Sequence, residues 1–187
     1  MMNLTKGDAV IYTGLPSGTL LNGSTYLLEE IEGDMAVLHR HGECSIEDLY
    51  PLRDFNGNDE VHRTYYEDRI AGTWTLPSDR SYINLQGLVK LYTEERLMEV
   101  SLDDIDGISL DLPERMRGEN CACCNGERFI TADTKKPLIL FVGLENPMGR
   151  TYRVMDGKHR IAKLRWCGKD TAMAYVLHID EVLPYFN

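Results

Sequence analysis

The stretch TYRVMDGKHRIAKLRWCG, Thr151–Gly168, predicts a strand, a tight turn and a helix in direct succession. Its first five residues are rich in β-forming side chains, and Asp156-Gly157 is a turn dipeptide. The residues that follow place three apolar side chains on one stripe of a helix: Ile161, Leu164 and Cys167. A second β-like run follows at Thr171–Ile179. This part of the chain therefore predicts a βαβ-type unit.

The turn at Asp156-Gly157 and the residues after it contain the candidate functional side chains. Lys158, His159 and Arg160 fall in the first turn of the expected helix, where free N–H groups already carry partial positive charge. Three basic side chains at that end suit a bound anion, because N-terminal amides and cations then converge on one phosphate. Asp156 can cap the helix. The alternative is a basic first turn that is simply solvated.

These residues resemble the D-G-x-H-R signature of the ParB/sulfiredoxin-like superfamily, and the closest letters are those of DGHHR-type kinases and DGQHR-type proteins. Two flanking segments match in order. Leu97–Ile105 resembles the opening strand and turn, and Lys136–Val142 resembles the strand before the signature. The resemblance spans roughly Leu97 to Leu183.

The resemblance implies a site for a nucleotide or another phosphate-bearing ligand, such as ATP with magnesium. It assigns phosphate contacts to four residues: Gly157, Lys158, His159 and Arg160. His159 and Asp156 are the catalytic candidates, and Glu114 is a candidate base or metal neutraliser, with Glu119 and Glu127 as alternatives. The implied enzyme is a nucleotide-dependent phosphotransferase or hydrolase, or a ParB-like nuclease. The alternative is a non-catalytic accessory module of phage or mobile-element type, which acts on a protein or nucleic-acid partner.

Two departures from the family's motifs argue against two of its activities, sulfinic-acid reduction and chromosome partitioning. Sulfiredoxins carry their catalytic cysteine where this chain has Lys158, which argues against sulfinic-acid reduction. Partitioning ParB proteins carry a G-E-R-R type motif and a downstream helix-turn-helix domain, neither of which we expect here.

Composition sets further limits. The 187 residues are 43% hydrophobic, enough for a packed core, and the formal net charge of −10 disfavours DNA as a broad nonspecific partner. Seven basic residues nevertheless stand against Asp156 alone between Arg150 and Lys169, which suggests one local anion site. The opening residues lack the apolar core of a secretion signal, and five cysteines fit a reducing compartment. We therefore expect a cytoplasmic protein without membrane partners.

The expected fold class is α+β. Residues 1–53 contain four short β-like runs separated by Gly/Asn/Pro turns, and they resemble an SH3-like β-barrel that could bind a protein partner. Residues 54–96 form a linker and helical segment, with a boundary at Asp54–Asp59 and helices expected at Glu60–Ile70 and Ser81–Arg96. Residues 97–187 form the ParB/sulfiredoxin-like α/β domain.

The last motif is the cysteine run at Cys121, Cys123 and Cys124. Three thiols in four residues can bind zinc if Cys167 or a histidine supplies a fourth ligand. The chain lacks the matching second C-x-x-C pair of common zinc sites, so the pattern favours an incidental or disulfide-capable loop over zinc. The C-x-x-C spacing of Cys121 and Cys124 also leaves a redox role open. The sequence alone thus predicts no metal ligand.

Overall fold

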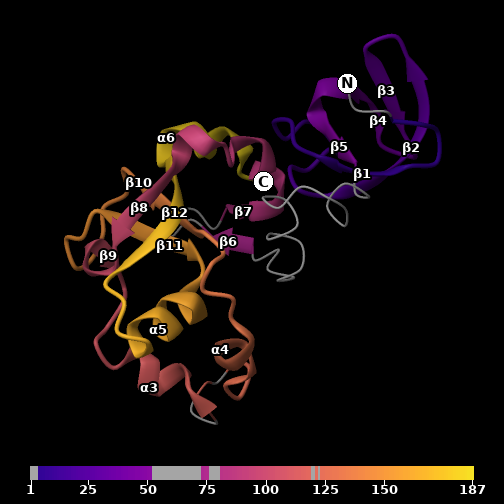
Figure 1. Cartoon of the computed structure of the whole chain (residues 1–187). Helices are drawn as coiled ribbons and strands as arrows, with labels where there is room; N and C mark the ends of the chain where they lie inside the picture. The colour runs from indigo at the N-terminus through magenta and orange to yellow at the C-terminus, as the bar shows by residue number, and fades with distance from the viewer. Residues whose placement is uncertain (1–3, 52–72, 76–80, 119–120, 122) are drawn as a thin grey trace. The chain divides into compact units, whose positions relative to one another are not determined.

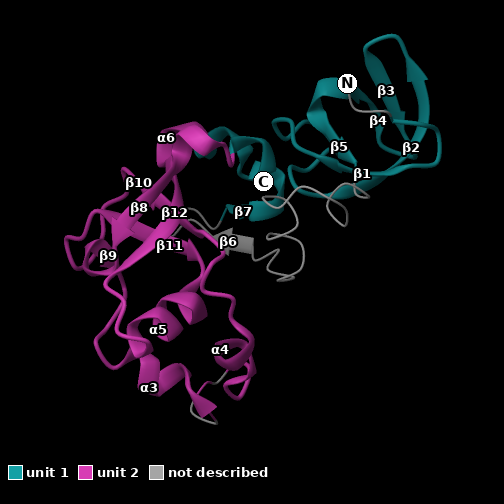
Figure 2. Cartoon of the chain, viewed as in Figure 1, with its two compact units in different colours: residues 1–91, 182–187 teal, residues 92–181 magenta. Residues whose placement is uncertain are grey.

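A computed structural model describes residues 4–51, 73–75, 81–118, 121 and 123–187 (Figure 1). The chain forms two compact units, residues 1–91 with 182–187, and residues 92–181 (Figure 2). Each is built around a five-stranded sheet, so the fold is mixed α and β as expected. Residues 182–187, which the sequence analysis grouped with the C-terminal domain, lie in the first unit. The expected boundary at 54–59 and helix at 60–70 lie outside the described residues.

The first unit contains a curled antiparallel sheet in the order β4-β3-β2-β1-β5. Its strands are β1 (Ala9–Tyr12), β2 (Thr25–Glu32), β3 (Met35–Leu38), β4 (Gly42–Ser45) and β5 (Leu49–Pro51). The alternation of buried and exposed positions is clearest at the start of β2, where Tyr26 and Leu28 point inward. Each of the other four strands contributes to the same core, with the residues Val10, Ala36, Leu38, Cys44 and Leu49. The four expected β-like runs are confirmed, with the last one divided between β4 and β5.

The expected helix at 81–96 is wrong. This segment forms β7 (Tyr82–Asn84), paired with β6 (Thr73–Thr75), and then a 3-10 helix at Leu85–Leu91. A side chain at Gly87 would lie 2.6 Å from the backbone nitrogen of Gly23, so this helix packs tightly against the loop before β2. A strand and a 3-10 helix thus share the segment that was expected to form one helix.

The second unit contains a mixed sheet in the order β8-β12-β10-β11-β9. Its strands are β8 (Leu97–Ser101), β9 (Ile105–Asp106), β10 (Leu138–Val142), β11 (Tyr152–Asp156) and β12 (Thr171–His178). β10 is central, and its residues 138–141 are buried, which explains its unbroken apolar sequence. The strands expected at 97–105, 136–142, 151–155 and 171–179 are confirmed.

The helices of the second unit are α3 (Leu112–Met116), α4 (Glu127–Thr131), α5 (Lys158–Trp166) and α6, whose range Ile179–Val182 crosses the unit boundary. Both α3 and α4 pack on α5. The β11–α5–β12 succession is confirmed, but it is not a parallel βαβ unit. β10 lies between the two strands, antiparallel to β11 and parallel to β12, so β11 and β12 run in opposite directions. Strand direction depends on pairing with β10, which lies outside residues 151–179.

Among the described residues, no helix combines the length and the apolar character needed to cross a membrane.

Candidate metal centre

The DGKHR turn joins β11 to α5. Gly157 has φ 108°, and a Cβ there would lie 2.5 Å from the Leu138 side chain, so both the conformation and the space require glycine. Gly157 itself is the N-cap, and a glycine offers no side chain to cap the helix. The Asp156 carboxylate accepts a hydrogen bond from the Arg160 guanidinium one turn further on, and helix capping by Asp156 stays a prediction.

The Asp156–Arg160 pair is buried, with relative exposures of 7% and 4%. A buried ion pair is costly to break, because one partner left alone carries an uncompensated charge. Arg160, to which the resemblance assigns a phosphate contact, is thus held inside the unit. Lys158 is exposed at the start of α5, and Glu114 is exposed on α3. Glu127 is exposed at the start of α4, and Glu119 lies outside the described residues.

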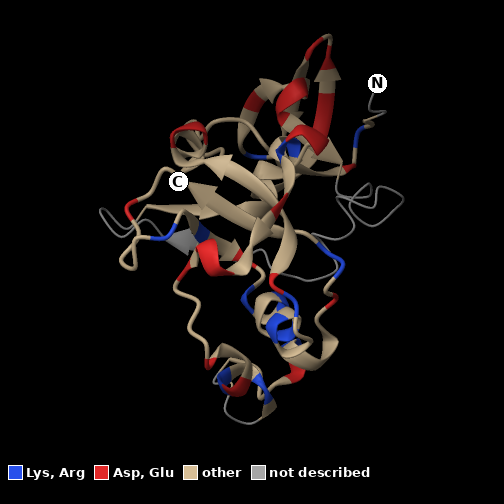
Figure 3. Ribbon diagram, turned by 60° about the vertical axis from the view of Figure 1, so that its left-hand side comes forward, with Lys and Arg blue, Asp and Glu red and all other residues tan. Residues whose placement is uncertain are grey.

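Figure 3 shows basic residues gathered on α5. Most side chains of this basic segment make contacts within the second unit. Arg153 pairs with Asp106 at 3.5 Å, and Arg165 pairs with Asp103 at 2.7 Å. Lys163 Nζ donates to the backbone carbonyls of Ile130 and Ala132, at 2.7 and 2.8 Å. Together with Arg160, four of the seven cations between 150 and 169 therefore have internal partners. The seven basic residues therefore do not together form one open anion site.

The loop between α3 and α4 carries the three cysteines. Its two ends meet at glycines: a Cβ on Gly126 would lie 2.3 Å from the backbone nitrogen of Gly118. Inside the loop, the amides of Cys124 and Asn125 both donate to the carbonyl of Cys121, at 3.3 and 2.9 Å. These turns gather the thiols on a small, closed segment.

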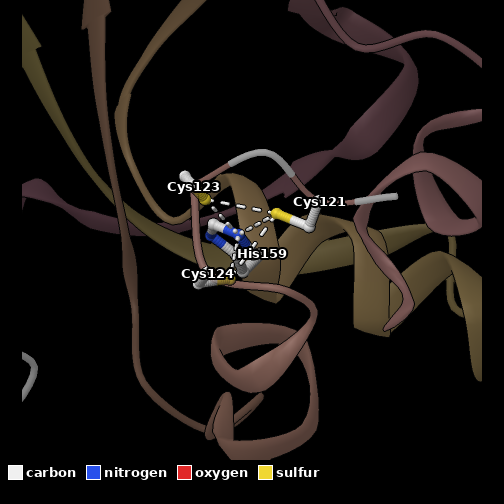
Figure 4. A group of neighbouring side chains, drawn as sticks. All are labelled: Cys121, Cys123, Cys124 and His159. Carbon is white, nitrogen blue, oxygen red and sulfur yellow. Dashed lines mark hydrogen bonds between the residues drawn. The ribbon is translucent and has the colours of Figure 1, made fainter. Parts of the chain in front are cut away.

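His159 points into that segment, as Figure 4 shows. Its Nε2 lies 3.4 Å from the Sγ atom of Cys121, 3.3 Å from that of Cys123 and 3.6 Å from that of Cys124. The Cys121 sulfur is 3.2 Å from the Cys123 sulfur and 3.5 Å from the Cys124 sulfur. All four ligand atoms lie within 4.8 Å of one another. The fold thus brings one side chain from α5 to three from a loop more than thirty residues earlier.

This group could hold a metal ion. A tetrahedral centre with bonds of about 2.3 Å to sulfur and 2.0 Å to nitrogen places its ligand atoms roughly 3.5–3.8 Å apart. The three distances from His159 Nε2 to sulfur, 3.4, 3.3 and 3.6 Å, match that spacing, whereas the 3.2 Å between the Cys121 and Cys123 sulfurs is about half an ångström shorter. The donors are soft thiolates plus an imidazole, the set that suits zinc-like ions. The cysteine pattern by itself favoured an incidental loop, and the sequence predicted no metal ligand. It could not identify the fourth ligand, because only folding brings His159 to the loop.

Cys167 was the other candidate for the fourth ligand and was expected on the buried stripe of the helix. It is exposed just beyond the end of α5 and is not part of the cluster, whereas Ile161 and Leu164 are buried as expected. The buried face of α5 instead includes Arg160 and Ala162.

The thiols do not share one electrostatic environment. The hydrogen bond with His159 lowers the pKa of Cys121 to about 6, against the effect of burial. The hydrogen bond with Cys121, followed by burial, raises the pKa of Cys123 to about 11. One negative sulfur is therefore stabilised while its neighbour resists losing a proton. A divalent cation removes this conflict, because it replaces the protons and pairs with several thiolates at once.

Comparisons of the chain with protein-family models, with curated proteins and with solved structures gave no match. The case for function therefore depends on the geometry of these residues.

Proposed function

We propose that the second unit binds one zinc ion through Cys121, Cys123, Cys124 and His159, and that this ion fixes the α3–α4 loop to the start of α5. The observation that carries the proposal is the convergence of four ligand atoms within 4.8 Å. Four protein ligands leave no open position for water or substrate, which is the arrangement of structural rather than catalytic zinc. The ion would stabilise a binding module.

This assignment changes the role of His159. An imidazole whose Nε2 holds a metal no longer exchanges a proton there near neutral pH, so it cannot act as the general acid or base at that atom. The proposal thus favours the non-catalytic alternative over a phosphotransferase, hydrolase or nuclease that relies on His159.

The test is metal content by mass spectrometry, together with the visible spectrum of the cobalt-substituted protein. We expect about one zinc per chain and a cobalt spectrum with thiolate charge-transfer bands and tetrahedral intensity. His159→Ala should weaken zinc binding at least tenfold, since it removes one of four ligands. Cys167→Ser is the matched control and should bind zinc as the wild type does. Zinc affinity unchanged in His159→Ala would refute the site.

The second candidate function is the binding of a phosphate-bearing ligand by a ParB/sulfiredoxin-like domain, beside an SH3-like barrel formed by residues 1–53. The observation that favours it is the start of α5. This nine-residue helix begins after a glycine N-cap and has no acidic residue in its first turn, and Lys158 is exposed there. Arg160 would have to leave Asp156 to take part, so the backbone amides and Lys158 are the stronger candidates for contact.

A thermal-shift screen tests this function with ATP, CTP, GTP and ADP, each with and without magnesium. A nucleotide that binds the folded state raises the melting temperature by mass action, and Lys158→Ala should lose that shift. Arg160→Ala is a poor probe because it leaves Asp156 buried without its partner and would destabilise the fold itself. If no nucleotide shifts the zinc-loaded wild type, nucleotide binding at this turn is wrong.

A further inference from the structure

Two thiols of the proposed zinc site differ in their access to solvent. Cys123 is exposed, whereas Cys121 is only 5% exposed. Their sulfur atoms are nevertheless 3.2 Å apart, closer than the 3.5 Å between Cys121 and Cys124. An oxidant from solvent therefore meets Cys123 first, and the Cys121 sulfur already lies in contact with the Cys123 sulfur.

We propose that Cys121 and Cys123 form a reversible disulfide site through which a peroxide expels the metal. This inference rests on the proposed zinc site and adds regulation to it. A disulfide bond is about 2.05 Å long, so the two sulfurs need to approach by little more than an ångström.

The chemistry balances in two steps. The thiolate that Cys123 presents in the zinc-loaded protein attacks a peroxide oxygen: an S–O bond forms, the O–O bond breaks, and hydroxide leaves and is protonated by the buffer. The thiolate of Cys121 then attacks the sulfenic sulfur: an S–S bond forms, the S–O bond breaks, and a second hydroxide leaves and is protonated. The two thiolates lose two electrons, and hydrogen peroxide becomes two waters.

Oxidation removes two of the four ligands. Cys124 and His159 remain, and two ligands do not hold zinc against solvent at the affinity of a closed site. Loss of the ion releases the cysteine loop from α5 and frees His159 in the DGKHR turn. The second tie between α4 and α5, made by Lys163 to the carbonyls of Ile130 and Ala132, does not involve a thiol and persists.

The experiment exposes the zinc-loaded full chain to hydrogen peroxide while a zinc-sensitive dye reports release. We expect loss of about one equivalent of zinc, and its recovery after a thiol reductant and zinc are added back. Peptide mass spectrometry after alkylation should find a disulfide between Cys121 and Cys123, with the alkyl label on Cys124. Cys123→His keeps a zinc ligand but removes the oxidised thiol, and it should release zinc at least tenfold more slowly. Cys167→Ser should release zinc at the wild-type rate.

Three outcomes would overturn the inference: zinc retained at peroxide concentrations that oxidise the exposed Cys167, zinc released with sulfinic acid in place of a disulfide, or the alkyl label found on Cys121. The metal content of the untreated protein is read first. Protein that neither contains nor takes up zinc refutes the proposed function, whereas protein that keeps its zinc under peroxide refutes only the redox site.

Discussion

At the scale of single residues, His159 shows how far one side chain's role depends on what faces it. Its position in the DGKHR motif indicated a phosphate contact or a general acid/base. In the folded chain its Nε2 lies within 3.6 Å of three cysteine sulfurs, which makes it a metal ligand in the proposed site. Arg160 is a parallel case, because it pairs with buried Asp156 instead of facing solvent.

Gly126 is the residue on which closure of the cysteine loop depends. It has φ 83°, and a Cβ would collide with the backbone of Gly118. We expect Gly126→Ala to lower the free energy of unfolding by about 3 kcal/mol, since left-handed strain and overpacking add. It should also weaken zinc binding. Urea unfolding and chelator competition measure the two effects.

Gly149→Ala is the matched control. Gly149 has φ 68°, and a Cβ there would meet nothing within 4 Å, so the change should cost only about 1 kcal/mol and leave zinc affinity unchanged. Equal losses of stability in the two variants would show that contact between the ends of the loop is not what closes it.

At the scale of elements, α5 contacts both the cysteine loop and the end of α4, through one side chain each. His159 and Lys163 are four residues apart and therefore share one face of the helix. His159 reaches the loop before α4, and Lys163 reaches the carbonyls at the end of α4. The short helix α4 is thus fastened at both ends. It also places Phe129 in the hydrophobic core of the unit.

Lys163→Met tests this arrangement while it keeps most of the apolar length of the side chain. Loss of two charged hydrogen bonds to carbonyls should lower the free energy of unfolding by about 1–2 kcal/mol. Hydrogen exchange at α4 should accelerate even with zinc bound. Lys158→Met, on the exposed first residue of α5, is the control and should leave the exchange of α4 unchanged. The same rate of exchange in both variants would mean that Lys163 does not fasten α4.

At the scale of the whole molecule, each unit has its own hydrophobic core, and the proposed metal ligands lie outside the main core cluster of the second unit. That cluster draws on Leu138 and Leu140 of β10, Ile161 of α5 and Ala174 of β12. The sheet is therefore stabilised by burial of apolar surface, whereas in our proposal the loop depends on the zinc ion.

Removal of zinc by a chelator should consequently loosen only part of the chain. We expect hydrogen exchange to rise over 112–118 and 123–131 and at the start of α5, while β10 and β12 stay protected. The curled sheet of the first unit is the internal control and should exchange at the same rate before and after chelation. Uniform loss of protection in the second unit would instead make the metal a requirement for its whole fold.

The sequence by itself determined the succession of elements. Apolar runs and glycine turns predicted four β-like runs, which form the five strands of the curled sheet, and also β10, β11, α5 and β12, because these signals are local in the chain. Only the tertiary structure decided the site. The fourth ligand of the cysteine group comes from a helix more than thirty residues away, and the partners of Arg153 and Arg165 lie on segments distant in the chain. Contacts between distant segments depend on how strands pair and which helix face is buried, and no local pattern encodes that geometry.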